Sequence, residues 1–158
     1  MLKKGSKAPN FKLSSAPDQH VMLTDLKGKK VVLLFYPADW SPICSDELSI
    51  FNASIKLLKK YNAYIVGISV DSVWSHDAFS KERLLHFPLL ADFEPKGEIA
   101  MCYNVYNQST GMAKRAIYLI DEKGIIRWNY LSPDNVNRGV DGVLTVLEDL
   151  QKEISSCD

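Results

Sequence analysis

The chain alternates continuously apolar runs with stretches in which apolar residues recur every three or four positions. The runs 31–36 and 63–70 are rich in β-branched residues, and Pro37 stops the first of them, so both predict strands buried on two faces. Between these runs, a helix that extends to about Lys60 is predicted by apolar residues at Leu48, Phe51, Ile55 and Leu58. Strand and helix therefore alternate along this part of the chain.

The alternation continues beyond the second strand. A polar stretch leads into a predicted helix at about 76–84, and a short extended piece follows at 87–90. Pro95 suits the first turn of a helix, so we expect one from there to about Tyr103. A loop through Gly111 comes next.

Hairpins are predicted near both ends of the chain. The short runs 12–13 and 21–23 indicate an N-terminal β-hairpin, and the β-rich runs 115–120 and 125–130 flank the turn-forming residues 121–124. A C-terminal amphipathic helix is predicted from apolar residues at Val140, Val143, Leu144, Leu147 and Leu150. This order favours an α/β protein with a thioredoxin-like fold, in which helices flank a central mixed β-sheet and an N-terminal β-hairpin is added.

Composition limits the number of domains and the classes of partner. The chain has 158 residues, 46% of them apolar, which predicts a single domain over residues 1–158. Lysine plus arginine equals aspartate plus glutamate at 19 each, so we expect neither nucleic acid nor a membrane as a partner. No secretory signal or apolar run long enough to span a bilayer is visible, which favours a cytoplasmic protein.

Three cysteines, Cys44, Cys102 and Cys157, form a sparse and odd-numbered set that favours chemistry over a disulfide framework. Ser41 is a favoured helix N-cap residue and Pro42 suits the first helical position, which places Cys44 third in the first turn. Free backbone N–H groups and the helix dipole there favour the reactive thiolate. Local sequence leaves a second interpretation open, in which Cys44 is a small buried hydrophobic residue.

The segment around Cys44 resembles the signature of the peroxiredoxin family. That signature is a Pro, three residues, a Thr or Ser, two residues and the peroxidatic Cys, and it is matched by Pro37, Ser41 and Cys44. Glu47 also fits the usual pattern of the family.

A second motif carries the same resemblance. Residues 115–124 read as an arginine that opens an apolar strand ending in Ile-Asp-x-x-Gly, and Arg115 stands at the position of the family's arginine. Residues 87–92 and 103–107 look most like the short Q-type (bacterioferritin-comigratory) and E-type (one-cysteine alkyl hydroperoxide reductase) members. The resemblance extends over about residues 7–150.

The resemblance implies a thiol-dependent peroxidase that needs no metal or organic cofactor. The thiolate of Cys44 attacks hydrogen peroxide or a small organic hydroperoxide and becomes a sulfenic acid. Arg115, Ser41 and nearby backbone N–H groups are expected to stabilise the departing oxygen, and Pro37 to screen the sulfur from water. Two residues of secondary rank, which also suit packing or the first helical turn, are Glu47 and Trp40.

The route by which the sulfenic acid is reduced depends on the other cysteines. Many Q-type relatives carry a second cysteine five residues after the first, and here Ser49 occupies that position. Cys102 is either a resolving cysteine or part of the core, and Cys157 lies in a polar C-terminal tail. We therefore expect resolution by an external thiol or a thioredoxin-like reductant, with Cys157 and Cys102 as the alternatives.

Two other functions draw on the same residues. A redox-sensing or chaperone-like binding protein would use oxidation of Cys44 as a switch. A thioredoxin-type disulfide oxidoreductase requires a Cys-x-x-Cys motif, and Glu47 stands where the second cysteine would be. The family resemblance also implies a homodimer, with the Trp40 loop and residues 105–111 at the contact. A solvated or hydrogen-bonded state without a catalytic role is the expectation for His20, His76 and His86.

Overall fold

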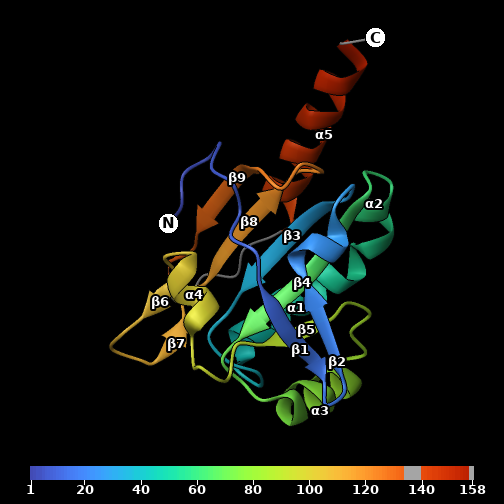
Figure 1. The fold of residues 1–158 in the computed structure, drawn as a ribbon. Helices are drawn as coiled ribbons and strands as arrows, with labels where there is room; N and C mark the ends of the chain where they lie inside the picture. The colour runs from blue at the N-terminus through green and yellow to red at the C-terminus, as the bar shows by residue number, and fades with distance from the viewer. Residues whose placement is uncertain (134–139, 157–158) are drawn as a thin grey trace.

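The computed structural model describes residues 1–133 and 140–156, and its centre is a seven-stranded mixed β-sheet with the strand order β2-β1-β5-β4-β3-β8-β9 (Figure 1). β3 pairs in parallel with β4, and β4 with β5, whereas β8 and β9 are antiparallel to their neighbours. The strands of this sheet are β1 (Lys12–Ala16), β2 (Gln19–Met22), β3 (Lys30–Phe35), β4 (Ala63–Ser69), β5 (Leu89–Ala91), β8 (Ala116–Ile120) and β9 (Ile126–Leu131).

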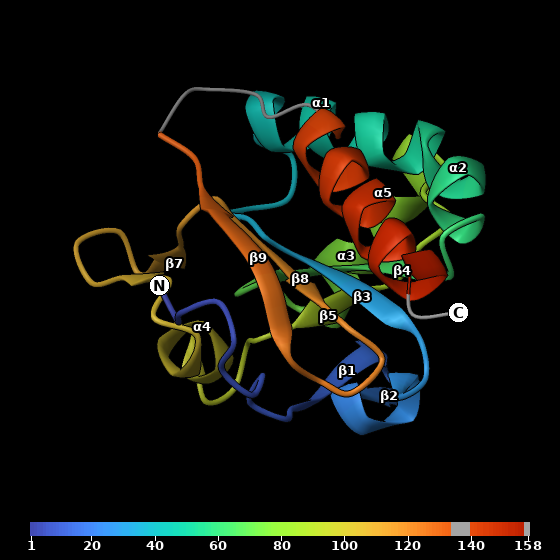
Figure 2. The ribbon, with the colours of Figure 1, turned by 90° about the horizontal axis from the view of Figure 1, so that it is seen from above.

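Helices cover both faces of the sheet, as the view from above shows (Figure 2). The helices are the 3₁₀ turn η1 (Leu23–Leu26), α1 (Pro42–Ala53), α2 (Ile55–Lys59), α3 (Val73–Arg83), α4 (Glu98–Cys102) and α5 (Asp141–Ser156). α1, α2 and α5 lie on one face with the buried side of α3, and α4 lies on the other face with the N-terminal segment.

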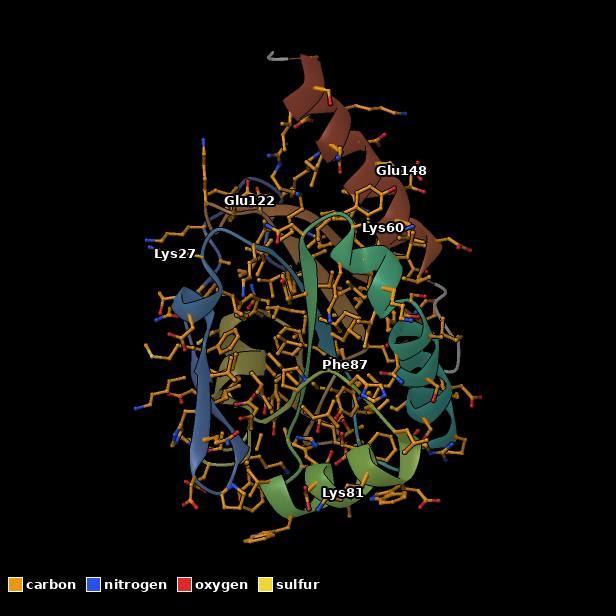
Figure 3. All side chains as sticks on the ribbon, turned by 90° about the vertical axis from the view of Figure 1, so that its right-hand side faces the viewer. Lys27, Lys60, Lys81, Phe87, Glu122 and Glu148 are labelled. Carbon is orange, nitrogen blue, oxygen red and sulfur yellow. The ribbon has the colours of Figure 1, made fainter. Side chains whose placement is uncertain are left out.

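Strand β3 supplies side chains to both layers of the core. All six of its residues are buried, and alternate ones point to opposite faces. Val32 and Leu34 belong to the cluster under α1 and α5, whereas Leu33 and Phe35 belong to the cluster under α4. Phe87 lies in the interior in Figure 3, and the labelled lysines and glutamates lie at the periphery.

The structure confirms the predicted fold class and most of the predicted elements. The N-terminal hairpin, the two central strands, the late β8–β9 hairpin and the C-terminal helix are all present. The central position of β3 follows from its continuously apolar sequence, because a strand buried on both faces needs apolar side chains at every position.

Three local predictions were wrong. The single helix to about Lys60 is divided at Ser54, whose backbone leaves the helical region (φ −98°, ψ 3°) while its hydroxyl donates to the Ile50 carbonyl oxygen at 3.0 Å. α4 begins at Glu98 and not at Pro95, because Gly97 adopts a left-handed conformation (φ 72°) just before it. The predicted loop through Gly111 contains a small antiparallel pair, β6 (Tyr106–Asn107) with β7 (Met112–Ala113).

Within residues 1–133 and 140–156, no helix is both long enough and apolar enough to cross a membrane.

Candidate active site

The candidate site lies in the loop that joins β3 to α1. Ser41 occupies the N-cap position, Pro42 begins α1, and Cys44 is the third helical residue, as the sequence predicts. The Ser41 side chain makes no capping hydrogen bond, but its carbonyl oxygen accepts the first helical bond from the Ser45 N–H at 2.9 Å. The Ile43 and Cys44 N–H groups therefore belong to the first turn, where a helix offers them no internal partner.

Arg115 donates from Nη2 to the sulfur of Cys44 at 3.1 Å. The two residues are 71 positions apart in the sequence, and strand register brings them together. Phe35, the last residue of β3, pairs with Ala116, the first residue of β8, so the residue before β8 lies beside the loop that leaves β3. The Arg115 carbonyl oxygen also accepts the Ser132 N–H at 2.9 Å, which ties this end of β8 to the chain after β9.

Both partners of this contact are buried, since Cys44 is 0% exposed and Arg115 5%. A permanent positive charge removed from water is stabilised by an anionic partner, and the thiolate form of Cys44 provides one. Nη1 of Arg115 is buried and has no hydrogen-bond partner among the residues that the structure describes. One guanidinium thus contacts the sulfur and keeps a second donor group available beside it.

Other predicted site residues surround this pair at different depths. Glu47 is fully buried one turn after Cys44, and Pro37 is partly exposed within the loop. Trp40 is half exposed, has a left-handed backbone (φ 69°) and packs edge-on against Phe79 of α3 at 5.2 Å between ring centroids. Pro37, Trp40, Ser41, Cys44 and Glu47 therefore all belong to one loop and the first two turns of α1.

Of the two remaining cysteines, the structure describes only Cys102. Cys102 is exposed at the last position of α4, so its interpretation as a core residue was wrong. Cys157 lies outside the described residues.

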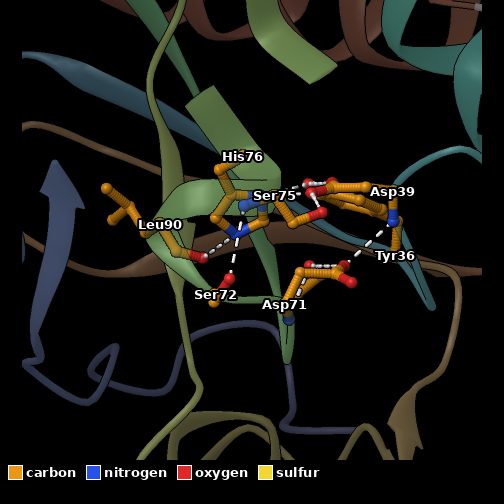
Figure 4. A network of polar contacts seen from close by, with 8 residues as sticks. Tyr36, Asp39, Asp71, Ser72, Ser75, His76 and Leu90 are labelled. Atoms are coloured by element: carbon orange, nitrogen blue, oxygen red, sulfur yellow. Dashed lines mark hydrogen bonds and ion pairs between the residues drawn. The ribbon is translucent and has the colours of Figure 1, made fainter. Parts of the chain in front are cut away.

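A buried polar network next to this loop escaped the sequence analysis (Figure 4). Asp39 accepts hydrogen bonds from Tyr36 Oη at 2.7 Å and Ser75 Oγ at 2.9 Å, and its Oδ2 lies 2.8 Å from Nδ1 of His76. Burial, followed by the neighbouring Asp39 carboxylate, raises the pKa of Tyr36 well above its ordinary value, which keeps its hydroxyl a donor. The available signal was the position of Asp39 inside the motif loop, three residues after Tyr36. Its partners Ser75 and His76 come from α3, which no local pattern connects to the loop.

Comparisons with known proteins identify the family of the chain. The AhpC/TSA family model matches residues 4–129. The chain belongs to this family. It is 36% identical over 160 residues to a putative peroxiredoxin, ycf42, of Pyropia yezoensis, covering 95% of this chain and 79% of that protein.

Solved structures of family members share the whole fold. The crystal structure of Enterococcus faecalis AhpC matches with a TM-score of 0.89 at 27% identity, covering 100% of this chain and 98% of that one. A yeast mitochondrial 1-Cys peroxiredoxin matches with a TM-score of 0.87 at 28% identity, covering 98% of this chain and 79% of that one. The chain is accordingly an oxidoreductase of the thiol-dependent peroxidase class.

Proposed function

We propose that this protein reduces hydrogen peroxide and small organic hydroperoxides with Cys44 as the attacking thiolate. The contact between Nη2 of Arg115 and the Cys44 sulfur carries this proposal, because a buried guanidinium beside a cysteine favours the thiolate. The sulfur attacks one peroxide oxygen, the O–O bond breaks, and the other oxygen leaves as hydroxide or alkoxide and takes up a proton. Sulfur is oxidised to sulfenic acid and the peroxide is reduced.

The surroundings of the sulfur supply donors where negative charge develops. Nη1 of Arg115 is buried without a partner in the described chain, so it is available to donate to a peroxide oxygen. The first-turn N–H groups of α1 have no partner within the helix and are further donors at its N-terminal end, as is the Ser41 hydroxyl, which makes no capping bond. Pro37 limits access of water, while Glu47 and Trp40 support the loop and helix.

In the proposed one-cysteine mechanism, an external thiol or thioredoxin-like reductant reduces the Cys44 sulfenic acid and completes the catalytic cycle. Ser49 rules out a disulfide at the nearest position, and Cys102 is exposed on α4, which packs on the sheet face opposite α1. The yeast mitochondrial 1-Cys peroxiredoxin has a thiol resolving mechanism that operates via the glutathione and thioredoxin systems. A cytoplasmic location is part of the proposal, since a reducing compartment supplies such thiols.

The decisive experiment follows peroxide consumption with dithiothreitol as reductant and detects the Cys44 sulfenic acid by mass spectrometry. Cys44→Ser should reduce turnover to the uncatalysed level, because a hydroxyl is a far weaker nucleophile than a thiolate at neutral pH. The matched control is the double variant Cys102→Ser plus Cys157→Ser, which should keep turnover with the same reductant.

Two results would contradict this proposal in different ways. Collapse of turnover in the double variant would assign resolution to Cys157 or Cys102 and leave the peroxidase intact. Slow oxidation of Cys44 without recycling in the wild type would instead favour a redox-sensing or chaperone-like binding protein.

A further inference from the structure

His76 has hydrogen-bonding contacts on both sides of its ring, although it is 2% exposed. Its Nε2 lies 3.1 Å from the carbonyl oxygen of Leu90, and its Nδ1 lies 2.8 Å from Oδ2 of Asp39. A carbonyl oxygen only accepts, so Nε2 must carry a proton. His76 thereby links β5 and α3 to the loop that precedes Cys44.

Asp39 is held from several directions at once. Its carboxyl group accepts hydrogen bonds from Tyr36 Oη and Ser75 Oγ and contacts Nδ1 of His76. Its backbone N–H donates to Oδ2 of Asp71 at 2.9 Å. Oδ2 of Asp71 also accepts Ser69 Oγ at 2.5 Å, which anchors this part of the network to the end of β4 (Figure 4). Two side chains of α3, Tyr36 directly after β3 and Asp71 in the loop before α3 thus fix one residue of the loop.

The residue that follows Asp39 needs such support. Trp40 has a left-handed backbone (φ 69°), a conformation that costs a bulky L-residue on the order of 1–2 kcal/mol and persists where the surroundings enforce it. Pro42, two residues later, begins α1. The direction in which the chain enters α1, and with it the place of the Cys44 sulfur, therefore depends on where Asp39 is held.

We propose that His76 is a positioning residue for the peroxidatic loop: through Asp39 it holds the Trp40 turn so that the Cys44 sulfur meets Arg115. Arg115 immediately precedes β8, far from the loop in sequence, so the 3.1 Å contact requires the loop and the strand to be placed accurately relative to each other. A misplacement of about 1 Å at a reacting group costs roughly 10²-fold in rate. This inference rests on the proposed function of Cys44.

Two substitutions separate the two sides of the ring. His76→Asn places an amide N–H near the position of Nδ1, so it keeps the contact with Asp39 and loses that with Leu90. His76→Gln places its amide near the position of Nε2, so it keeps Leu90 and loses Asp39. Glutamine is closer to histidine in volume, so a packing role would favour His76→Gln, whereas the positioning role favours His76→Asn.

The measurement is the second-order rate constant for oxidation of Cys44 by hydrogen peroxide, with the alkylation rate of Cys44 by iodoacetamide measured alongside. We expect His76→Gln to lower the peroxide rate by about 10–100-fold. Alkylation, measured at a pH above the ordinary thiol pKa so that ionisation no longer depends on Arg115, should rise because displacement of the loop exposes the fully buried sulfur. His76→Asn should stay within about fivefold of the wild type in both, since the retained hydrogen bond to Asp39 limits the change to about 1 kcal/mol.

Other outcomes overturn the inference. Equal peroxide rates in the two variants, or a slower His76→Asn, would reduce His76 to a packing residue. Alkylation needs no peroxide, so a wild type without peroxidase activity but with the predicted order of alkylation would refute the proposed function and keep the positioning role.

A milder pair of variants covers the case in which both histidine substitutions unfold the protein in a thermal melt. Ser75→Ala removes one donor to Asp39 and should lower the peroxide rate several-fold, on the scale of one hydrogen bond of about 1 kcal/mol. Ser80→Ala, on the same helix and outside the network, should leave the rate unchanged. An unchanged rate in Ser75→Ala would overturn the inference.

Discussion

At the scale of single residues, the proposed function depends on the two terminal N–H groups of the Arg115 guanidinium. Nη2 contacts the Cys44 sulfur at 3.1 Å while Nη1 remains buried and available beside it. A lysine ammonium is a single point charge and cannot occupy both places. Arg115→Lys should therefore lower the second-order rate of Cys44 oxidation by about 10²–10³-fold, the scale of one lost transition-state donor. Stopped-flow kinetics with hydrogen peroxide at constant pH measures this rate.

Arg127 provides the matched control for this substitution. It lies on β9, where it pairs with Asp121 and Glu153, and its side chain is 30% exposed. Arg127→Lys keeps the charge in a solvated ion pair and should change neither the rate nor, by more than about 1 kcal/mol, the free energy of unfolding. A rate in Arg115→Lys equal to that of Arg127→Lys would remove Arg115 from the catalytic machinery.

The structural roles of residues that lie close together in the sequence could be predicted. Their contacts with residues far away in the sequence could be predicted only in part. The Pro37, Ser41 and Cys44 pattern placed the loop and the helix start, and family resemblance added Arg115. The Asp39–His76 network is built by contacts across 37 positions, and no local period or capping rule encodes such a pair. The hydroxyl of Ser41 shows the limit at close range, because the residue takes the cap position without making the capping bond.

At the scale of elements, the short helix α4 depends on the turn that precedes it. Gly97 adopts φ 72°, and a Cβ there would lie 2.3 Å from the ring of Tyr106. Gly97→Ala should lower the free energy of unfolding by about 2–4 kcal/mol, since left-handed strain adds to overpacking. Urea denaturation measures it. Gly28→Ala, at φ 86° with nothing within 4 Å, carries the strain alone and should cost about 1 kcal/mol.

Equal losses in the two glycine variants would show that the ring of Tyr106 moves aside without cost. The same turn explains why the start of α4 was wrongly predicted: Pro95 favours a first helical turn in general, but here the left-handed Gly97 sets the boundary at Glu98. Strands were easier to predict, because the continuously apolar β3 and β4 have few alternatives to the middle of a sheet.

At the scale of the whole molecule, we expect a homodimer in which the Trp40 loop and residues 105–111 meet a second copy. Trp40 is 50% exposed, and an aromatic side chain of this size on a loop is typical of a contact residue. Sedimentation velocity should give twice the chain mass of 17.8 kDa for the wild type. Trp40→Ala should shift the equilibrium toward monomer at micromolar concentration, because loss of an aromatic anchor weakens binding by about 2 kcal/mol or more.

Leu57→Ala removes a comparably exposed apolar side chain from α2, outside both loops, and should leave the dimer intact. A wild type that sediments only as monomer would refute the dimer, whereas equal dissociation in both variants would move the contact away from the loop and separate assembly from the peroxidatic site.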